Sequence, residues 1–272
     1  MDVVAGAVGG GYMFARLFRQ DMPWAFYVVL GASVWLMYTV DHLLDAQRLQ
    51  EKASTARHFF HYQYGTAIKA ICVVLAIATP VLAFTQLSET AVYFGIGMGL
   101  LSLLHMVIVK YVGDATSPFL IKELGVAMVY SFGVAGLPVL ESGLIWTPEA
   151  LVIVGQFLLL ALANLIEFSM YEVASDTRDG HTSFVRAIGV QPARNLATAL
   201  LVIVAGLAVW MILRAPVGSF VIWVEAILLL MTGTLTTVLY LPDWMGKADR
   251  YRTFGDGAFL LPLLALVIPG NV

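Results

Sequence analysis

The sequence predicts an all-α polytopic membrane protein, a single transmembrane domain of about nine helices over residues 1–272. The first observation is composition: the chain is 60% hydrophobic and only 12% charged, against about 25% charged in soluble domains. The second is that its apolar residues gather into segments approaching the length of about 20 residues that a membrane-spanning helix needs. We therefore expect a helical bundle surrounded by lipid.

The apolar segments are separated by stretches rich in proline, glycine and charged residues. We expect helices over 2–18, 22–44, 60–86, 89–109, 118–140, 148–174, 193–213, 217–241 and 255–271. The first segment is the shortest, and its glycines at positions 6, 9, 10 and 11 would allow close helix packing in lipid. If it does not cross the membrane, the amino terminus changes sides but the later loops do not.

Basic residues predict the orientation, because short cytoplasmic loops carry an excess of Lys and Arg. The loops after the second, fourth, sixth and eighth helices hold Arg48, Lys52, Arg57, Lys110, Lys122, Arg178, Arg186, Arg194, Lys247, Arg250 and Arg252. The opposite loops hold only Arg214, apart from Arg16 and Arg19 after the first helix. We expect an integral protein of the cell inner membrane, with its amino terminus inside and its carboxyl terminus outside.

An acidic stripe ends the sixth apolar segment. Glu172, Asp176 and Asp179 stand at i, i+4 and i+7, so their carboxylates share one helix face. Like charges on one face repel unless a cation lies among them. Alone, the stripe is equally compatible with a solvated helix end partnered by Arg178.

A second acidic pair ends the second apolar segment, on the same predicted side of the membrane. Asp41 and Asp45 are one helical turn apart, and Arg48 continues their face. Lys52 and Arg57 follow in the next loop. Carboxylates from two helices beside basic residues suit Mg²⁺, which is usually held by one or two carboxylates and the phosphates of a substrate.

These two acidic motifs resemble those of the UbiA superfamily of intramembrane prenyltransferases, which have nine transmembrane helices. Its motifs, NDxxDxxxD after the second helix and DxxDxxxD after the sixth, together hold Mg²⁺ and a prenyl diphosphate. Asp41 and Asp45 fall on the last two acids of the first motif, but Met37 and Tyr38 stand in place of its Asn-Asp pair.

The second motif and the adjoining loops are also similar in part. Glu172 and Asp176 fall on the last two acids of the second motif, and Ser169 replaces its first. The stretch 179–182 is similar to the family's glycine-threonine segment, and the stretch 55–57 to its basic loop, where a histidine replaces the expected proline.

The resemblance implies a role for each of these charged residues. The Mg²⁺ ligands, and hence the catalytic residues, would be Asp41, Asp45, Glu172 and Asp176. The candidates for contacts to the diphosphate are Arg48, Lys52, Arg57, Lys110 and Lys122, with Asp179 in support. Lys110 and Lys122 could equally mark the membrane interface.

Polar residues inside the apolar segments are expected to face the bundle interior. Asn164, Glu167 and Tyr171 lie at i, i+3 and i+7, deeper than the acidic stripe. They would orient a lipophilic acceptor or form a hydrogen-bond network between helices. Glu225 is expected to pair inside the bundle, whereas Arg252 would balance aspartates of the last loop.

Two functions follow. The first is Mg²⁺-dependent transfer of a prenyl group from a prenyl diphosphate to a lipophilic acceptor within the membrane. The alternative is a catalytically degenerate UbiA-like subunit that binds a lipid or pigment, or assists assembly, in a membrane complex. Met37 and Tyr38 favour the alternative, because they remove two ligands. The sequence contains no nucleic-acid-binding module.

Overall fold

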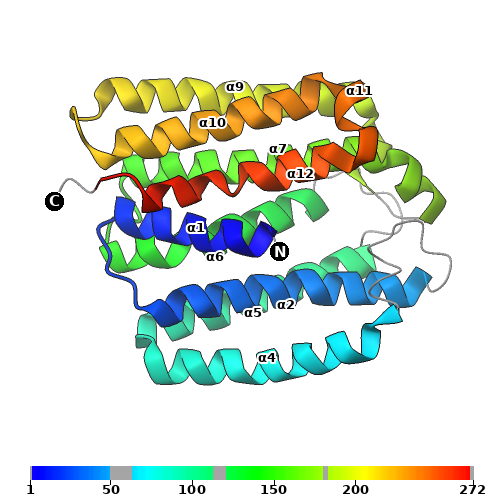
Figure 1. Cartoon of the computed structure of the whole chain (residues 1–272), viewed down its shortest axis with the longest axis horizontal. Helices are drawn as coiled ribbons and strands as arrows, with labels where there is room; N and C mark the ends of the chain where they lie inside the picture. Colours follow the sequence, from blue (N-terminus) through cyan, green and yellow to red (C-terminus); the bar gives the residue numbers. More distant parts are fainter. Residues whose placement is uncertain (1, 50–62, 113–120, 180–182, 270–272) are drawn as a thin grey trace.

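The computed structural model describes residues 2–49, 63–112, 121–179 and 183–269, without the side chains of 45–49, 110–112, 121, 176 and 179. Every regular element in these ranges is helical. The longer helices lie side by side with roughly parallel axes, so that their ends form two opposite faces of one bundle (Figure 1). The predicted all-α class is confirmed.

Seven of the described helices are long and apolar enough to cross a membrane. They are α2 (Trp24–Leu49), α4 (Gly65–Gln86), α5 (Glu89–Val112), α6 (Ile121–Ser142), α7 (Pro148–Asp179), α9 (Val190–Arg214) and α10 (Phe220–Tyr240). These correspond to the seven middle segments predicted from the sequence. A polytopic membrane protein is therefore supported, but the count of nine spans is not confirmed.

The first predicted segment forms α1 (Asp2–Leu17), a helix of 16 residues that is about 24 Å long. Met13 and Phe14 are fully buried, and Figure 1 shows α1 in the middle of the bundle. A Cβ atom on Gly6 would lie 2.7 Å from the carbonyl oxygen of Phe259. Glycine thus allows the close helix packing expected from the sequence.

The last predicted segment, 255–271, does not form one helix. It is divided between α12 (Arg250–Ala258) and the 3₁₀ helix η3 (Leu261–Leu266), and the prediction of a continuous span was wrong. Pro262 lies in the first turn of η3, where its missing N–H prevents α12 from continuing with regular hydrogen bonds. Two short elements, α11 (Pro242–Met245) and η2 (Lys247–Asp249), connect α10 to α12.

Arg16, an exception to the predicted charge distribution, ties the first and last elements together. Its guanidinium donates hydrogen bonds to the carbonyl oxygens of Ala265 and, at 2.9 Å, of Ile268. It also lies over the ring of Phe220, 4.4 Å from the centroid. Arg16 therefore satisfies backbone carbonyls at the end of η3, which explains a cation at this end of the bundle.

Candidate functional site

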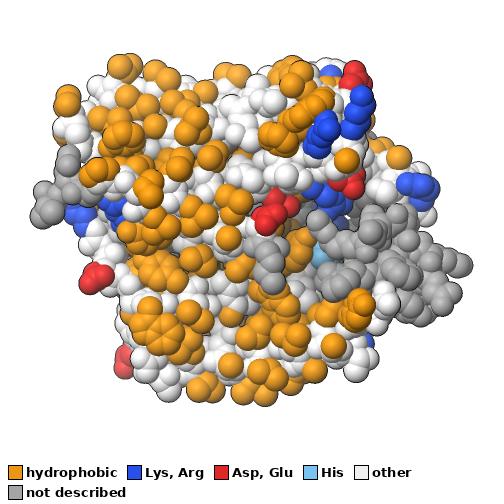
Figure 2. Space-filling model, in the orientation of Figure 1, with side chains coloured by type: hydrophobic (Ala, Val, Ile, Leu, Met, Phe, Trp, Pro, Cys, Tyr) orange, Lys and Arg blue, Asp and Glu red, His pale blue; other side chains and the backbone are white. Residues whose placement is uncertain are grey.

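The candidate site lies where α2 and α7 end and α12 begins, at one end of the bundle (Figure 1). The apolar part of α7 ends at Ser175 and that of α2 at Leu44, but both helices continue further. Figure 2 shows Lys and Arg side chains gathered at this end of the visible face. The two acidic motifs are thus carried by helices that end at the same side of the bundle.

Glu172 on α7 forms an ion pair with Arg252 on α12. Arg252 Nη2 lies 2.7 Å from Glu172 Oε1, and each side chain is 24% exposed. The hydroxyl of Tyr251 donates to the same oxygen at 3.3 Å, and Arg252 Nε donates to that hydroxyl at 3.1 Å. Arg252 thus contacts an acid of the predicted site, a partner that the sequence did not indicate.

Aromatic side chains hold this part of α12 against α7. The rings of Tyr171 and Tyr251 stack with centroids 4.5 Å apart, and Phe168 meets Tyr251 edge-on at 5.7 Å. The Tyr171 hydroxyl donates to the carbonyl oxygen of Val238 on α10 at 2.6 Å. A Cβ atom on Gly255 would lie 2.5 Å from the ring of Phe168, so glycine permits this close approach.

The contact also shifts the pKa values of Tyr251 and Arg252, which lie outside the seven apolar spans. Burial, with the Glu172 carboxylate, raises the pKa of Tyr251. Burial lowers the pKa of Arg252, but Glu172 and the hydroxyls of Tyr251 and Tyr38 outweigh it, so the net shift is upward. Arg252 is therefore a permanent cation.

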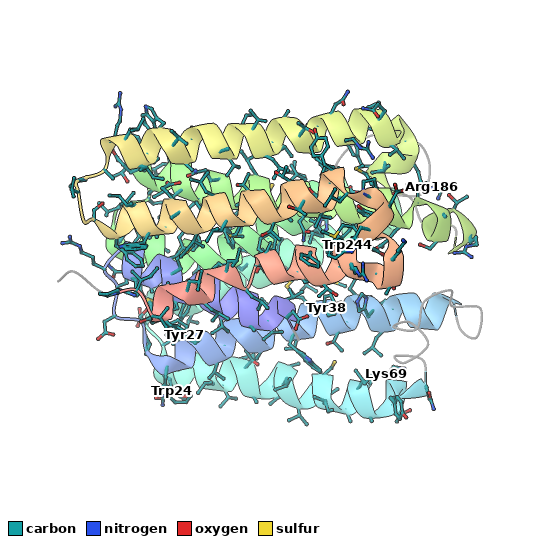
Figure 3. All side chains as sticks on the ribbon, turned by 45° about the horizontal axis from the view of Figure 1, so that its top comes forward. Trp24, Tyr27, Tyr38, Lys69, Arg186 and Trp244 are labelled. Carbon is teal, nitrogen blue, oxygen red and sulfur yellow. The ribbon has the colours of Figure 1, made fainter. Side chains whose placement is uncertain are left out.

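Tyr38 is a residue of α2 that lies near the same site. It interacts electrostatically with Arg252, and its ring lies 4.3 Å from that of His42. In Figure 3 the labelled Tyr38 and Trp244 lie near α12 on either side. Tyr38, at a position where the resemblance expects a carboxylate, thus places a phenol near a guanidinium.

The described donors suit magnesium in kind. Asp41 is exposed on α2, Glu172 is half-buried on α7, and carboxylate oxygen is the ligand that Mg²⁺ prefers. Asp45 and Asp176 lie on the same two helices, but their side chains are outside the described part. Within the described part, no group of three or more His, Cys, Asp or Glu could hold a metal ion. Bound phosphate would have to supply the remaining oxygens, as it usually does for Mg²⁺.

Most of the predicted diphosphate-binding cations fall outside the described side chains. Lys52 and Arg57 lie in the range 50–62, whereas Arg48 and Lys110 lie on α2 and α5 without described side chains. Lys122 is exposed near the start of α6. Asp179 is the last residue of α7, and its side chain is also outside the described part.

The turn before α12 has an unusual backbone. Ala248 and Asp249 have φ values of 53° and 52°, in the left-handed region that L-residues other than Asn and Asp seldom adopt. Arg250 follows and lies 4.5 Å from the centroid of the Trp244 ring. The turn thereby directs Tyr251 and Arg252 toward α7.

Glu123, near the start of α6, is a buried acid that the sequence did not single out. It is 5% exposed and accepts hydrogen bonds from Ser169 Oγ at 3.2 Å and from the backbone N–H of Phe184 at 3.1 Å. Phe184 begins the short helix α8 (Phe184–Ile188). Glu123 therefore anchors the segment that follows the second acidic motif, and Ser169 is its partner on α7.

The polar residues inside α7 face the interior, as predicted. Asn164 is 7% exposed and Glu167 is fully buried. Among the described residues, neither Asn164 Oδ1 nor either carboxylate oxygen of Glu167 has a hydrogen-bond partner. A hydrogen-bond network between helices is therefore formed by Tyr171 but not by these oxygens.

The prediction that Glu225 pairs inside the bundle is confirmed. Its Oε2 accepts a hydrogen bond from Gln156 Nε2 at 2.9 Å, and both side chains are fully buried. The same amide nitrogen also approaches the carbonyl oxygen of Val204 at 3.4 Å. This pair joins α7, α9 and α10 far from the acidic motifs along α7 and is structural.

Comparison of the chain with protein-family models, with curated proteins and with solved structures gave no match. The function therefore has to be inferred from the residues of the chain itself.

Proposed function

We propose that the protein transfers a prenyl group from a prenyl diphosphate to a lipophilic acceptor within the membrane, in a Mg²⁺-dependent reaction. In this proposal α1 and the α12–η3 unit complete a UbiA-like bundle of nine membrane elements. The end that carries Glu172 and Arg252 faces the cytoplasm, and the protein lies in the cell inner membrane.

The observation that supports this proposal most is the meeting of Tyr38, Glu172 and Arg252 at one end of an apolar bundle. A prenyl diphosphate likewise has a charged end and an apolar part, namely an anionic head and an apolar tail. The carboxylates would hold Mg²⁺ for the head and the guanidinium would bind the head directly, while the apolar helices would enclose the tail. Lys and Arg beside the acids prevent the site from repelling the diphosphate.

The chain's own residues would share this work. Asp41, Asp45, Glu172 and Asp176 would hold Mg²⁺, which neutralises charge on the leaving diphosphate. Arg48, Lys52 and Arg57 would bind phosphate oxygens, since guanidinium groups can do so with two parallel hydrogen bonds. Asn164 and Glu167 would accept hydrogen bonds from a hydroxyl-bearing acceptor.

Titration calorimetry of the full-length protein in detergent micelles tests the proposal. With Mg²⁺ present, Asp45→Ala and Asp176→Ala are each expected to weaken binding of geranylgeranyl diphosphate at least about tenfold, because each removes a metal ligand. Glu149→Ala, an exposed acid at the opposite end of α7, is the control and should bind normally. Normal binding by both aspartate variants would contradict the proposal.

The second candidate is the non-catalytic lipid- or pigment-binding or assembly subunit. The specific observation in its favour is that Glu172 Oε1 is already bound by Arg252. Met37 and Tyr38, which replace two ligands of the first motif, favour it as well. The subunit would bind an apolar ligand irrespective of Mg²⁺. Equal binding of geranylgeraniol and its diphosphate, with or without the metal, would support this candidate instead.

A further inference from the structure

We propose that Arg252 is a diphosphate-binding residue whose guanidinium stays paired with Glu172 until that carboxylate is neutralised. The inference deepens the proposed function and rests on it for the identity of the ligand. Neutralising Glu172 would release the guanidinium, which would then bind a diphosphate group. The sequence did not assign Arg252 to the site.

Glu172 would attract both the guanidinium of Arg252 and a bound Mg²⁺. Arg252 Nη2 is 2.7 Å from Glu172 Oε1, so the guanidinium is engaged by an acid that the proposed function assigns to Mg²⁺. A carboxylate oxygen cannot keep its full attraction for the guanidinium while it binds a divalent cation. Metal binding to Glu172 would therefore weaken the ion pair and make the guanidinium more available to a phosphate.

Arg252 lies at the amino-terminal end of its helix. It lies in the first turn of α12, which contains no acidic residue and has no side-chain cap. The amino-terminal end of a helix favours anions, because its N–H groups lack partners within the helix. Lys247 and Arg250 stand close by in sequence, with Asp249 as the offsetting charge. A phosphate near Arg252 would thus meet a cationic chain segment.

The pair of Glu172 and Arg252 is accessible to solvent. Each side chain retains 24% exposure, unlike the fully buried Glu225 and Gln156. Tyr251 can keep Arg252 oriented after release, because Arg252 Nε donates to its hydroxyl at 3.1 Å. Exchange of one anion for another therefore requires only that the outer end of the guanidinium change partner.

The pair predicts an unusual result for Glu172→Gln. Without Mg²⁺, this variant should gain affinity for inorganic pyrophosphate, by about tenfold relative to the unsubstituted protein, because Arg252 has lost its competing carboxylate. With Mg²⁺, the same variant should lose affinity for geranylgeranyl diphosphate, because a metal ligand is missing. If the guanidinium of Arg252 cannot contact a bound phosphate, no gain is expected.

The experiment is calorimetric titration of the full-length protein in micelles, using pyrophosphate with a chelator and geranylgeranyl diphosphate with Mg²⁺. Glu172→Gln is compared with the double variant Glu172→Gln/Arg252→Gln, which should lose the gain. Glu149→Gln gives the same charge change at the other end of α7 and should show no gain. Glu172→Ala serves as a second variant if Glu172→Gln does not fold.

The outcomes separate the two proposals. A metal-free gain that disappears with Arg252→Gln supports the proposed role of Arg252, even if prenyl diphosphate fails to bind with Mg²⁺. Mg²⁺-dependent binding of prenyl diphosphate without any metal-free gain in the Glu172 variants leaves the proposed function standing and overturns the role of Arg252. Absence of binding in both titrations overturns both.

Discussion

The guanidinium of Arg252 lies 2.7 Å from the carboxylate of Glu172, which fastens the short helix α12 to the end of the long helix α7. Tyr251 extends this contact by donating to the same carboxylate oxygen while its ring stacks on Tyr171. Glu172 is thus not a solvated acid at the end of a helix. It is one side of a contact between two helices.

Breaking this pair should destabilise the protein measurably. Arg252→Gln and Glu172→Gln are each expected to lower the free energy of unfolding. A double-mutant cycle should give a coupling energy of about 1–2 kcal/mol, which lies between the values typical of exposed and of buried ion pairs. Reversible unfolding in mixed micelles would provide the four values. A coupling near zero would show that the contact contributes nothing to stability.

Substituting one residue of the buried pair Gln156 and Glu225 should destabilise the protein more than substituting both. Gln156→Leu leaves a buried carboxyl without its donor and should cost about 1–3 kcal/mol, whereas Gln156→Leu/Glu225→Leu should recover much of that loss. The physical reason is that an apolar pair leaves no buried polar group unpaired. Thermal unfolding of both variants checks this, and a double variant less stable than the single one would contradict it.

Glu123 should protect the backbone amide of Phe184 from hydrogen exchange. Glu123→Ala removes the acceptor that lies 3.1 Å from this N–H, so exchange should accelerate about fivefold for the loss of roughly 1 kcal/mol. Glu123→Gln retains a carbonyl oxygen and is the matched control. Unchanged exchange in Glu123→Ala would mean that the hydrogen bond does not hold the start of α8.

The left-handed conformation of Ala248 should make glycine favourable there. With φ at 53°, Ala248→Gly removes a steric cost and should raise the free energy of unfolding by about 0.5 kcal/mol. The same change at Ala258, the fully buried last residue of α12, should lower it by about 1 kcal/mol, because it removes a packed methyl group and adds freedom to the unfolded chain. Equal destabilisation by both changes would show that Ala248 does not adopt this conformation.

Hydropathy and charge predicted those parts of the fold that depend on local sequence. The seven long apolar helices between Trp24 and Tyr240 follow from apolar length alone. The interior position of Asn164, Glu167 and Glu225 follows from the cost of exposing polar groups to lipid. The last segment was predicted wrongly because a hydropathy average does not register that Pro262 interrupts the backbone hydrogen bonds.

The partners of charged residues were harder to predict. Arg252 lies among the acids of its own loop in sequence, yet its partner is Glu172, because stacking of Tyr251 on Tyr171 fixes how α12 lies on α7. Glu123 resembled an ordinary charged residue beside Lys122 at a helix start. Its role depends on the return of the chain at Phe184, which no local pattern encodes.

The central claim is that the end of the bundle formed by α2, α7 and α12 binds the head of a prenyl diphosphate together with Mg²⁺. The most direct measurement is calorimetric titration of the unsubstituted full-length protein with geranylgeranyl diphosphate, once with Mg²⁺ and once with a chelator. We expect saturable binding with the metal and at least about tenfold weaker binding without it. Absence of binding in both titrations, or equal binding in both, would contradict the claim.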